Sequence, residues 1–355
     1  MRVGVIGCGY WGSKHVRVLH AIPDVTQVVA IDRVQDRLSS LKQVFPHLTT
    51  FSDLEPALDY VDAVVIATPP RTHATLAMTA MSYGKSVLVE KPLATRTADA
   101  RRMVREAAER SLILMTGHTF EHNAAVWKLR DLVRGGELGR ICYLDSARLN
   151  LGLYQSDVNV VWDLAPHDVS IFNYVLGAVP ESVQAWGSRH GHSLLEDVAY
   201  LRLMYRDPDV TANIHVSWLD PCKVRRTTVV GSSKMAVYND LSSDQPIRVF
   251  DKGVVAPPDD ENLQDPPMSY RYGEIRAPYV MSEEPLSVQD REFVSCVLRG
   301  EQPSTDGNNG LSVVQVLECA DRSLPTGLPV RLDDLDDLEE VDEAEEQHSR
   351  LARVS

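Results

Sequence analysis

The sequence predicts an α/β fold in which a doubly wound parallel sheet is followed by a second, α+β domain. Short apolar runs alternate with helical patterns from residue 1 to about 120, which is typical of a parallel sheet with helices on both faces. From Ile141 the apolar runs follow one another with short connections, which favours a mostly antiparallel sheet. The chain of 355 residues is long enough for about two such domains.

The first half supplies the elements of the parallel sheet in order. We expect its strands at 2–6, 27–31, 63–67, 86–90 and 112–115. We expect its helices at 13–21, 36–45, 72–82 and 97–110. Such sheets bind ligands at the carboxyl ends of their strands, so the residues that follow each run are the first candidates for a site.

The second half has a different rhythm. We expect its strands at 141–149, 183–187, 198–204, 210–218, 227–230 and 234–238, and one helix at about 165–176. Residues 251–281 are rich in Pro, Asp and Tyr and read as irregular, and helices are expected at about 286–299 and 308–320. These patterns predict a first domain at 1–121, a second at 122–331 and a flexible acidic tail at 332–355.

The charge and the cysteines restrict the class of protein. Ten acidic residues between Asp333 and Glu346 account for most of the net charge of −14. The other 40 acidic residues stand against 36 basic ones, a net charge of −4. This balance gives no indication of a basic surface that would bind nucleic acid. No apolar run approaches the roughly 18 residues of a membrane span, and a strand at residue 2 leaves no room for a signal peptide. The five cysteines are scattered and never in Cys-x-x-Cys spacing. We therefore expect a cytoplasmic protein without a membrane partner.

A glycine-rich turn follows the first predicted strand. Glycines stand at Gly7, Gly9 and Gly12, in Gly-x-Gly-x-x-Gly spacing, with Tyr10 and Trp11 between the last two. The first glycine permits the tight turn, the second lets the backbone approach a pyrophosphate, and the third lets helix and strand pack closely. The helix N-terminus that follows favours an anion. The spacing, after a strand and before a helix, predicts a dinucleotide-binding Rossmann domain.

An acidic residue ends the second strand. Asp32 lies 20 residues beyond Gly12, where a carboxylate accepts hydrogen bonds from ribose hydroxyls and repels a 2′-phosphate. This favours NAD as the cofactor. Arg33 leaves NADP open, because its guanidinium could pair with a 2′-phosphate.

Glu90-Lys91-Pro92 follows the strand that ends at 90. A lysine at a strand end beside a nicotinamide could bind or protonate a substrate oxygen, and the peptide bond before Pro92 can be cis. The alternative is an ordinary surface lysine at a turn.

A second cluster is Asp163-Leu164-Ala165-Pro166-His167. A carboxylate and an imidazole four residues apart share a helix face, and the carboxylate can support the imidazole as a general base. Pro166 suits the first turn of this helix. The alternative is structural, with Asp163 as a helix cap and His167 as an ordinary structural histidine.

His118-Thr119-Phe120-Glu121-His122 matches the residue order of one zinc-peptidase motif. That motif needs a helix throughout, whereas Gly117 here follows a strand, so we expect no metal.

With these residues in order, the chain resembles the glucose-fructose oxidoreductase/inositol dehydrogenase (Gfo/Idh/MocA) family. The resemblance runs from residue 1 to about 330. It depends on four motifs, which are Gly7–Gly12, Thr68-Pro69 with His73, Glu90-Lys91-Pro92, and Asp163-x-x-x-His167. It implies a Rossmann domain, a C-terminal α+β domain whose large, mostly antiparallel open sheet builds homodimers or homotetramers, and a Lys91–Pro92 bond that is often cis.

The resemblance also implies roles for single residues. Thr68, Pro69, His73 and Glu90 would line the cofactor, and Lys91 would bind the substrate near the nicotinamide. Asp163 and His167 would flank the reacting hydroxyl, with His167 or, in some members, the lysine as the proton acceptor. The remaining substrate contacts would come from His118, Asn150 and Gln155.

Our hypothesis is an NAD-dependent dehydrogenase that acts on a secondary alcohol of a sugar, sugar nucleotide, amino sugar or cyclitol. Two alternatives stay open. One is an NAD-dependent glycosidase of the same fold, and the other is a cofactor-sensing regulator without catalysis.

Overall fold

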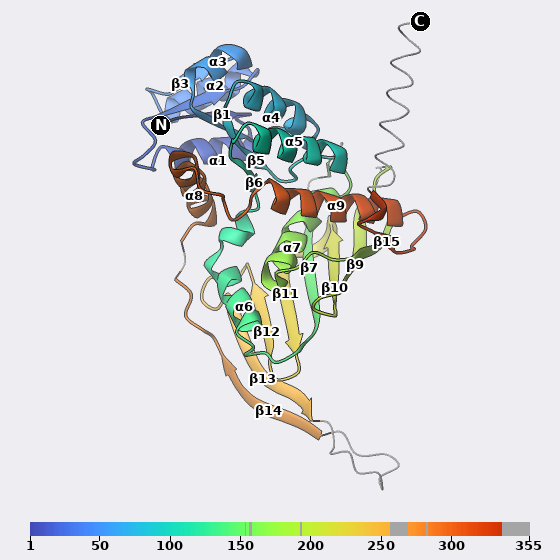
Figure 1. Ribbon diagram of the computed structural model, residues 1–355. Helices are drawn as coiled ribbons and strands as arrows, with labels where there is room; N and C mark the ends of the chain where they lie inside the picture. Colours follow the sequence, from blue (N-terminus) through green and yellow to red (C-terminus); the bar gives the residue numbers. More distant parts are fainter. Residues whose placement is uncertain (153, 156–157, 192–193, 256–268, 282, 336–355) are drawn as a thin grey trace, which may run out of the picture. The chain divides into compact units, whose positions relative to one another are not determined.

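The computed structural model describes residues 1–152, 154–155, 158–191, 194–255, 269–281 and 283–335 (Figure 1). The chain divides into two compact units. The first contains 1–122 and 283–318, and the second contains 123–282 and 319–336. In this division the segment 283–318, which the sequence pattern gives to the second domain, groups with the first unit.

The first unit holds a six-stranded parallel sheet in the order β3-β2-β1-β4-β5-β6. Its strands are β1 (Arg2–Ile6), β2 (Gln27–Ile31), β3 (Thr49–Phe51), β4 (Ala63–Ile66), β5 (Ser86–Glu90) and β6 (Leu114–Gly117). The strand order reverses between β1 and β4, and the crevice beyond the carboxyl ends of these two strands is where open α/β sheets bind ligands.

Helices connect the strands of this sheet. They are α1 (Tyr10–Leu19), α2 (Gln35–Val44), α3 (Leu54–Tyr60), α4 (His73–Ser82) and α5 (Thr97–Glu109), with 3₁₀ turns η1 (Pro70–Thr72) and η2 (Thr119–His122). Helix α8 (Pro285–Arg299) packs on α1 (Figure 1). The predicted α/β alternation is confirmed. The structure adds β3 and α3, which the sequence pattern did not predict, and places the last strand two residues later than expected.

The second unit holds a nine-stranded sheet in the order β14-β13-β12-β11-β7-β10-β9-β8-β15. Its strands are β7 (Ile141–Leu151), β8 (Ser182–Ser188), β9 (Val198–Tyr205), β10 (Val210–Ser217), β11 (Leu219–Gly231), β12 (Met235–Asn239), β13 (Ile247–Val255), β14 (Ser269–Arg276) and β15 (Val330–Arg331). The pair β7–β10 is parallel and the other pairs are antiparallel, which confirms the predicted α+β class.

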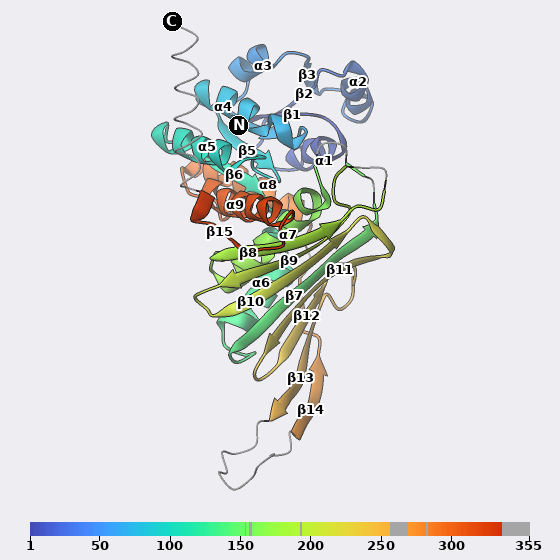
Figure 2. The ribbon, with the colours of Figure 1, turned by 90° about the vertical axis from the view of Figure 1, so that its right-hand side faces the viewer.

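Helices α6 (Ala124–Arg134) and α7 (Val160–Leu176) pack on each other and on this sheet (Figure 2). The last helix, α9 (Gly307–Ser323), begins in the first unit and ends in the second. Across the described residues, no helix is long and apolar enough to cross a membrane.

Three predictions for the second unit were wrong. Helix α6 was not expected, and α7 begins at Val160 rather than near 165 because Asn159 is its N-cap. Part of the stretch 251–281, which reads as irregular, forms strands β13 and β14. The acidic tail lies outside the described residues from residue 336 onward.

Candidate active site

The glycine turn joins β1 to α1. Gly7 has a φ of +87°, and a Cβ there would lie 2.6 Å from Thr68 Cγ2. A Cβ on Gly12 would lie 1.8 Å from the Gly7 carbonyl oxygen, so helix and strand meet without room for a side chain. A Cβ on Gly9 would meet nothing within 4 Å. The turn thus closes on the protein side and leaves open space at Gly9, as a pyrophosphate beside the α1 N-terminus requires.

Aromatic rings stand at the start of α1. Tyr10 and Trp11 are exposed, and their rings meet edge to face with centroids 5.5 Å apart. The Lys14 ammonium lies 4.4 Å from the centroid of the Tyr10 ring and 5.3 Å from that of Trp11. These side chains border the helix N-terminus on its solvent side.

Asp32 closes the turn from β2. Its Oδ2 accepts the Cys8 backbone N–H at 2.7 Å, and its Oδ1 accepts that of Val34 at 2.8 Å. Arg37 of α2 also donates to Oδ2 at 3.2 Å, whereas Arg33 is exposed and Asp32 itself is buried. The carboxylate is therefore fixed against the glycine turn, with Arg37 as a neighbour that the sequence did not point to.

The ends of β4 and β5 are tied together by His73. Its Nδ1 lies 2.8 Å from the Pro92 carbonyl oxygen and its Nε2 lies 2.8 Å from that of Thr68. Burial lowers the pKa of His73. Because the ring is buried, His73 fixes the backbone at the ends of β4 and β5, while Pro69 is exposed.

Lys91 follows β5 directly and is half-buried. The Lys91–Pro92 peptide bond is cis, as expected. The Lys91 N–H donates to Glu90 Oε2 at 3.2 Å.

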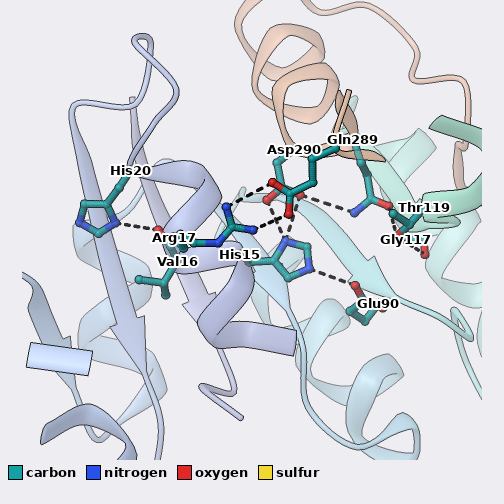
Figure 3. Close-up of polar contacts among 10 residues, drawn as sticks. His15, Val16, Arg17, His20, Glu90, Gly117, Thr119, Gln289 and Asp290 are labelled. Atoms are coloured by element: carbon teal, nitrogen blue, oxygen red, sulfur yellow. Dashed lines mark hydrogen bonds and ion pairs between the residues drawn. The ribbon is translucent and has the colours of Figure 1, made fainter. Parts of the chain in front are cut away.

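Glu90, the residue before Lys91, belongs to a buried ion network that the sequence did not reveal (Figure 3). The His15 ring on α1 lies between two carboxylates, Glu90 at the end of β5 and Asp290 on α8. Its Nε2 is 3.0 Å from Glu90 Oε1, and its Nδ1 is 2.9 Å from Asp290 Oδ2. Burial opposes the charge on this imidazole, but Asp290 and then Glu90 outweigh it and raise the pKa of His15 to about 10. The partners lie 75 and 275 residues away, so no local pattern could have shown them.

His118 follows β6 and is completely buried. Among the described residues, neither of its ring nitrogens has a hydrogen-bond partner. Burial, with smaller effects from His122 and Lys91, lowers the pKa of His118 to about 3, so the ring is neutral. Residues 119–122 form a 3₁₀ turn rather than an α-helix, which removes the geometry of the zinc-peptidase motif.

In the second unit, Asp163 and His167 lie one turn apart on α7. The alternative in which Asp163 caps this helix is wrong, and so is the prediction that Pro166 lies in its first turn. Asn159 is the cap, because its side chain accepts the N–H groups of Val161 and Trp162, and Pro166 stands inside the helix rather than in its first turn. The Asp163 carboxylate accepts the Trp218 indole N–H at 2.9 Å, so it is not needed as the cap.

Trp218 also contacts the loop after β7. The ring centroids of Trp218 and Tyr154 are 5.3 Å apart, and the Tyr154 hydroxyl donates to Asp197 at 3.1 Å. Asn150 is half-buried in the end of β7, and Gln155 is exposed in the loop beyond it. Trp218, which the sequence did not single out, thus joins this loop to Asp163.

The fold and the glycine turn define the class of the protein. A parallel sheet with a closed Gly-x-Gly-x-x-Gly turn and an acid at the end of β2, followed by an α+β domain, is the architecture of a nicotinamide-dependent oxidoreductase.

Comparisons with known proteins place it further. An oxidoreductase-family model described as an NAD-binding Rossmann fold matches residues 1–118, and the model of the GFO/IDH/MocA C-terminal domain matches residues 126–237. The chain belongs to the GFO/IDH/MocA family of oxidoreductases, which confirms the resemblance drawn from the motifs.

Three individual proteins illustrate the similarity. A myo-inositol 2-dehydrogenase from Thermotoga maritima is 27% identical over 350 residues, with 94% of this chain and 99% of the relative covered. A UDP-N-acetylglucosamine 3-dehydrogenase from Acidithiobacillus ferrooxidans is 34% identical over 188 residues, covering 53% and 58%. The crystal structure of GenD2 from gentamicin A biosynthesis in complex with NAD matches with a TM-score of 0.78 and 25% identity, covering 93% and 96%.

Proposed function

We propose that this protein is an NAD-dependent dehydrogenase that oxidises a secondary alcohol of a sugar, sugar nucleotide, amino sugar or cyclitol, or reduces the corresponding ketone. The observation that carries the proposal is the Asp163–His167 pair on α7. Asn159 caps the helix and the Trp218 indole N–H donates to Asp163, which orients this carboxylate one turn before His167. The named activities of the relatives from T. maritima and A. ferrooxidans are dehydrogenations of such substrates.

The cofactor would lie across the carboxyl ends of β1, β2 and β4. We propose Gly7, Gly9 and Gly12 for the pyrophosphate, Asp32 for the adenosine ribose, and Glu90 and Lys91 for the nicotinamide end. Tyr10, Trp11, Arg33, Thr68, Pro69 and His73 would complete the border. The open space at Gly9 and the buried Asp32 carboxylate support NAD, and Arg33 is the feature that would favour NADP.

When bound, NAD supplies the nicotinamide carbon that accepts a hydride. We propose that His167 takes the hydroxyl proton of the substrate and that Asp163 stabilises the protonated imidazole. Lys91 would stabilise the negative charge that develops on the same oxygen. This role requires that Lys91 and His167 reach one substrate oxygen.

His118, Asn150 and Gln155 are our candidates for the remaining substrate contacts. The two unsatisfied ring nitrogens of His118 support its candidacy, because a buried polar atom without a partner is unfavourable until a ligand or water supplies one.

The test is a panel of sugars, sugar nucleotides and cyclitols incubated with the full-length protein and NAD, with NADH absorbance as the readout. We expect turnover on at least one substrate and a fall in kcat of about 10²–10⁴ in Lys91→Ala and in His167→Ala. Lys42→Ala, at an exposed position in the last turn of α2, is the control and should retain kcat. Turnover that survives both active-site substitutions would refute the assigned roles. Glycoside cleavage without net NADH would indicate the glycosidase, and NAD binding without any turnover would indicate a regulator.

We also propose that the protein forms a homodimer or homotetramer through the sheet of the second unit. Trp186, Tyr200 and His215 stack side by side on adjacent strands, with centroid separations of 5.7 and 4.1 Å. Trp186 is 49% exposed, which a partner sheet would cover. Sedimentation of Trp186→Glu and of the wild type tests this assembly, and an unchanged oligomeric state in the variant would contradict it.

The five free cysteines support a cytoplasmic location.

A further inference from the structure

We propose that His15 is a positioning residue for Lys91, which it fixes in place through the Glu90 carboxylate. The inference rests on the proposed function, in which Lys91 acts on the substrate oxygen. His15 itself is completely buried and would touch neither the substrate nor the reacting atoms.

The His15 ring lies between two carboxylates, and this arrangement determines its protonation state. Glu90 and Asp290 approach opposite nitrogens of His15, at 3.0 and 2.9 Å. Ionised carboxylates only accept hydrogen bonds, so both ring nitrogens must donate and the ring is a cation between two anions. Charge-assisted hydrogen bonds of this kind are short and directional, which fixes the orientation of both carboxylates.

The Glu90 side chain is restrained by hydrogen bonds to both of its carboxylate oxygens. One carboxylate oxygen accepts from His15, and the other accepts the backbone N–H of Lys91 at 3.2 Å. Gly117 of β6 leaves little space beside the same side chain, since a Cβ there would lie 3.3 Å from both the Glu90 Cδ and its Oε1. The carboxylate therefore has a hydrogen bond on each oxygen, and one of these comes from the backbone of Lys91.

Asp290, on the other side of the His15 ring, is also held in place. Asp290 of α8 is completely buried, and Gln289 Nε2 lies 3.5 Å from its Oδ1. Gln289 in turn accepts the Thr119 hydroxyl at 2.8 Å (Figure 3). The chain of contacts therefore runs from α8 through the glycine-turn helix α1 to the backbone that directs Lys91.

The decisive variant keeps the net charge of the buried cluster constant. His15→Gln alone leaves two buried anions facing a neutral amide, which can prevent folding. The double variant His15→Gln/Asp290→Asn restores the original net charge of the cluster but removes the cation from Glu90. Asp290→Asn alone is the matched control, because it changes the far side of His15 and leaves the Nε2–H···Glu90 bond in place.

The first readout needs no substrate. Reductive methylation with ¹³C-formaldehyde labels the lysines, and the Lys91 signal is identified by its loss in Lys91→Arg. We expect the ¹³C signal of Lys91 to shift and broaden in the double variant and to coincide with the wild type in Asp290→Asn. The second readout is kinetic. We expect the double variant to lose about ten- to hundredfold in kcat, with the NAD KM within about twofold of the wild type.

An unchanged Lys91 signal in a folded double variant would overturn the proposal, whatever happens to kcat, because His15 would then be only a core ion pair. A shifted signal with wild-type kcat would overturn it as well. If the wild type turns over no substrate, the proposed function fails while the NMR comparison still decides whether His15 positions Lys91.

Discussion

The end of β5 and the start of α7 hold their candidate catalytic groups in different ways. Lys91 rests on a buried network of charges, Glu90, His15 and Asp290. Asp163 accepts a hydrogen bond from a neutral donor, the indole N–H of Trp218. Removing one member of a buried ion network leaves an uncompensated charge and is costly, whereas loss of a neutral hydrogen bond costs about 0.5–1.5 kcal/mol. The end of β5 should therefore respond sharply to substitution and the start of α7 gradually.

The largest effect is expected in the glycine turn of the first unit. In Gly12→Ala the new methyl group would collide with the Gly7 carbonyl oxygen, so both NAD affinity and the free energy of unfolding should fall. Gly9→Ala meets no protein atom and should weaken NAD binding, by about tenfold or more, without destabilising the fold. Calorimetric titration with NAD and thermal unfolding separate the two. Equal losses of stability in both variants would contradict the finding that Gly9 faces open space whereas Gly12 does not.

The next effect concerns the buried imidazole. The pKa of His15 rises from 6.5 to about 10 on folding, so its contribution to stability is complete below pH 6.5 and disappears as the pH rises through about 10. The contribution is on the order of a few kcal/mol. Urea denaturation of the wild type and of His15→Gln/Asp290→Asn from pH 6 to 10 should show the stability difference between them shrinking as the pH rises. A difference independent of pH would mean that the ring is not charged.

The smallest effect is expected on α7. Trp218→Phe removes the hydrogen bond to Asp163 and should lower kcat about three- to tenfold. Trp162→Phe is its matched control, because the Trp162 indole N–H donates to Asp321 instead, at 2.5 Å. Steady-state kinetics gives kcat for both variants, and we expect the larger fall in Trp218→Phe. A larger loss in Trp162→Phe would show that packing, rather than the orientation of Asp163, limits the rate.

The same contrast explains what could be predicted from the sequence. The glycine turn is local, since Gly7, Gly9 and Gly12 lie within six residues and the strand and helix around them have clear periodicity. The family and the α/β fold followed from that turn and from three short motifs. The His15 network depends on Asp290, which only the folded chain brings near, and Trp218 reaches Asp163 in the same way.

Other elements were missed for physical reasons that can be named. Every residue of β14 is exposed, so that strand has no apolar alternation to detect. Helix α7 starts five residues early because Asn159, rather than Asp163, accepts the free N–H groups of its first turn. Helix α6 does bury Ala125, Val126, Leu129 and Leu132 at helical spacing, so its signal was present in the sequence.

The central claim is that Lys91 and His167 serve one alcohol beside the nicotinamide. The most direct measurement is a crystal structure of the full-length protein with NAD and a substrate from the panel. The account predicts that Lys91 Nζ and a ring nitrogen of His167 both lie within about 3.2 Å of the same substrate oxygen, with the adjacent carbon facing the nicotinamide. A substrate oxygen that meets only one of the two, or neither, would contradict it.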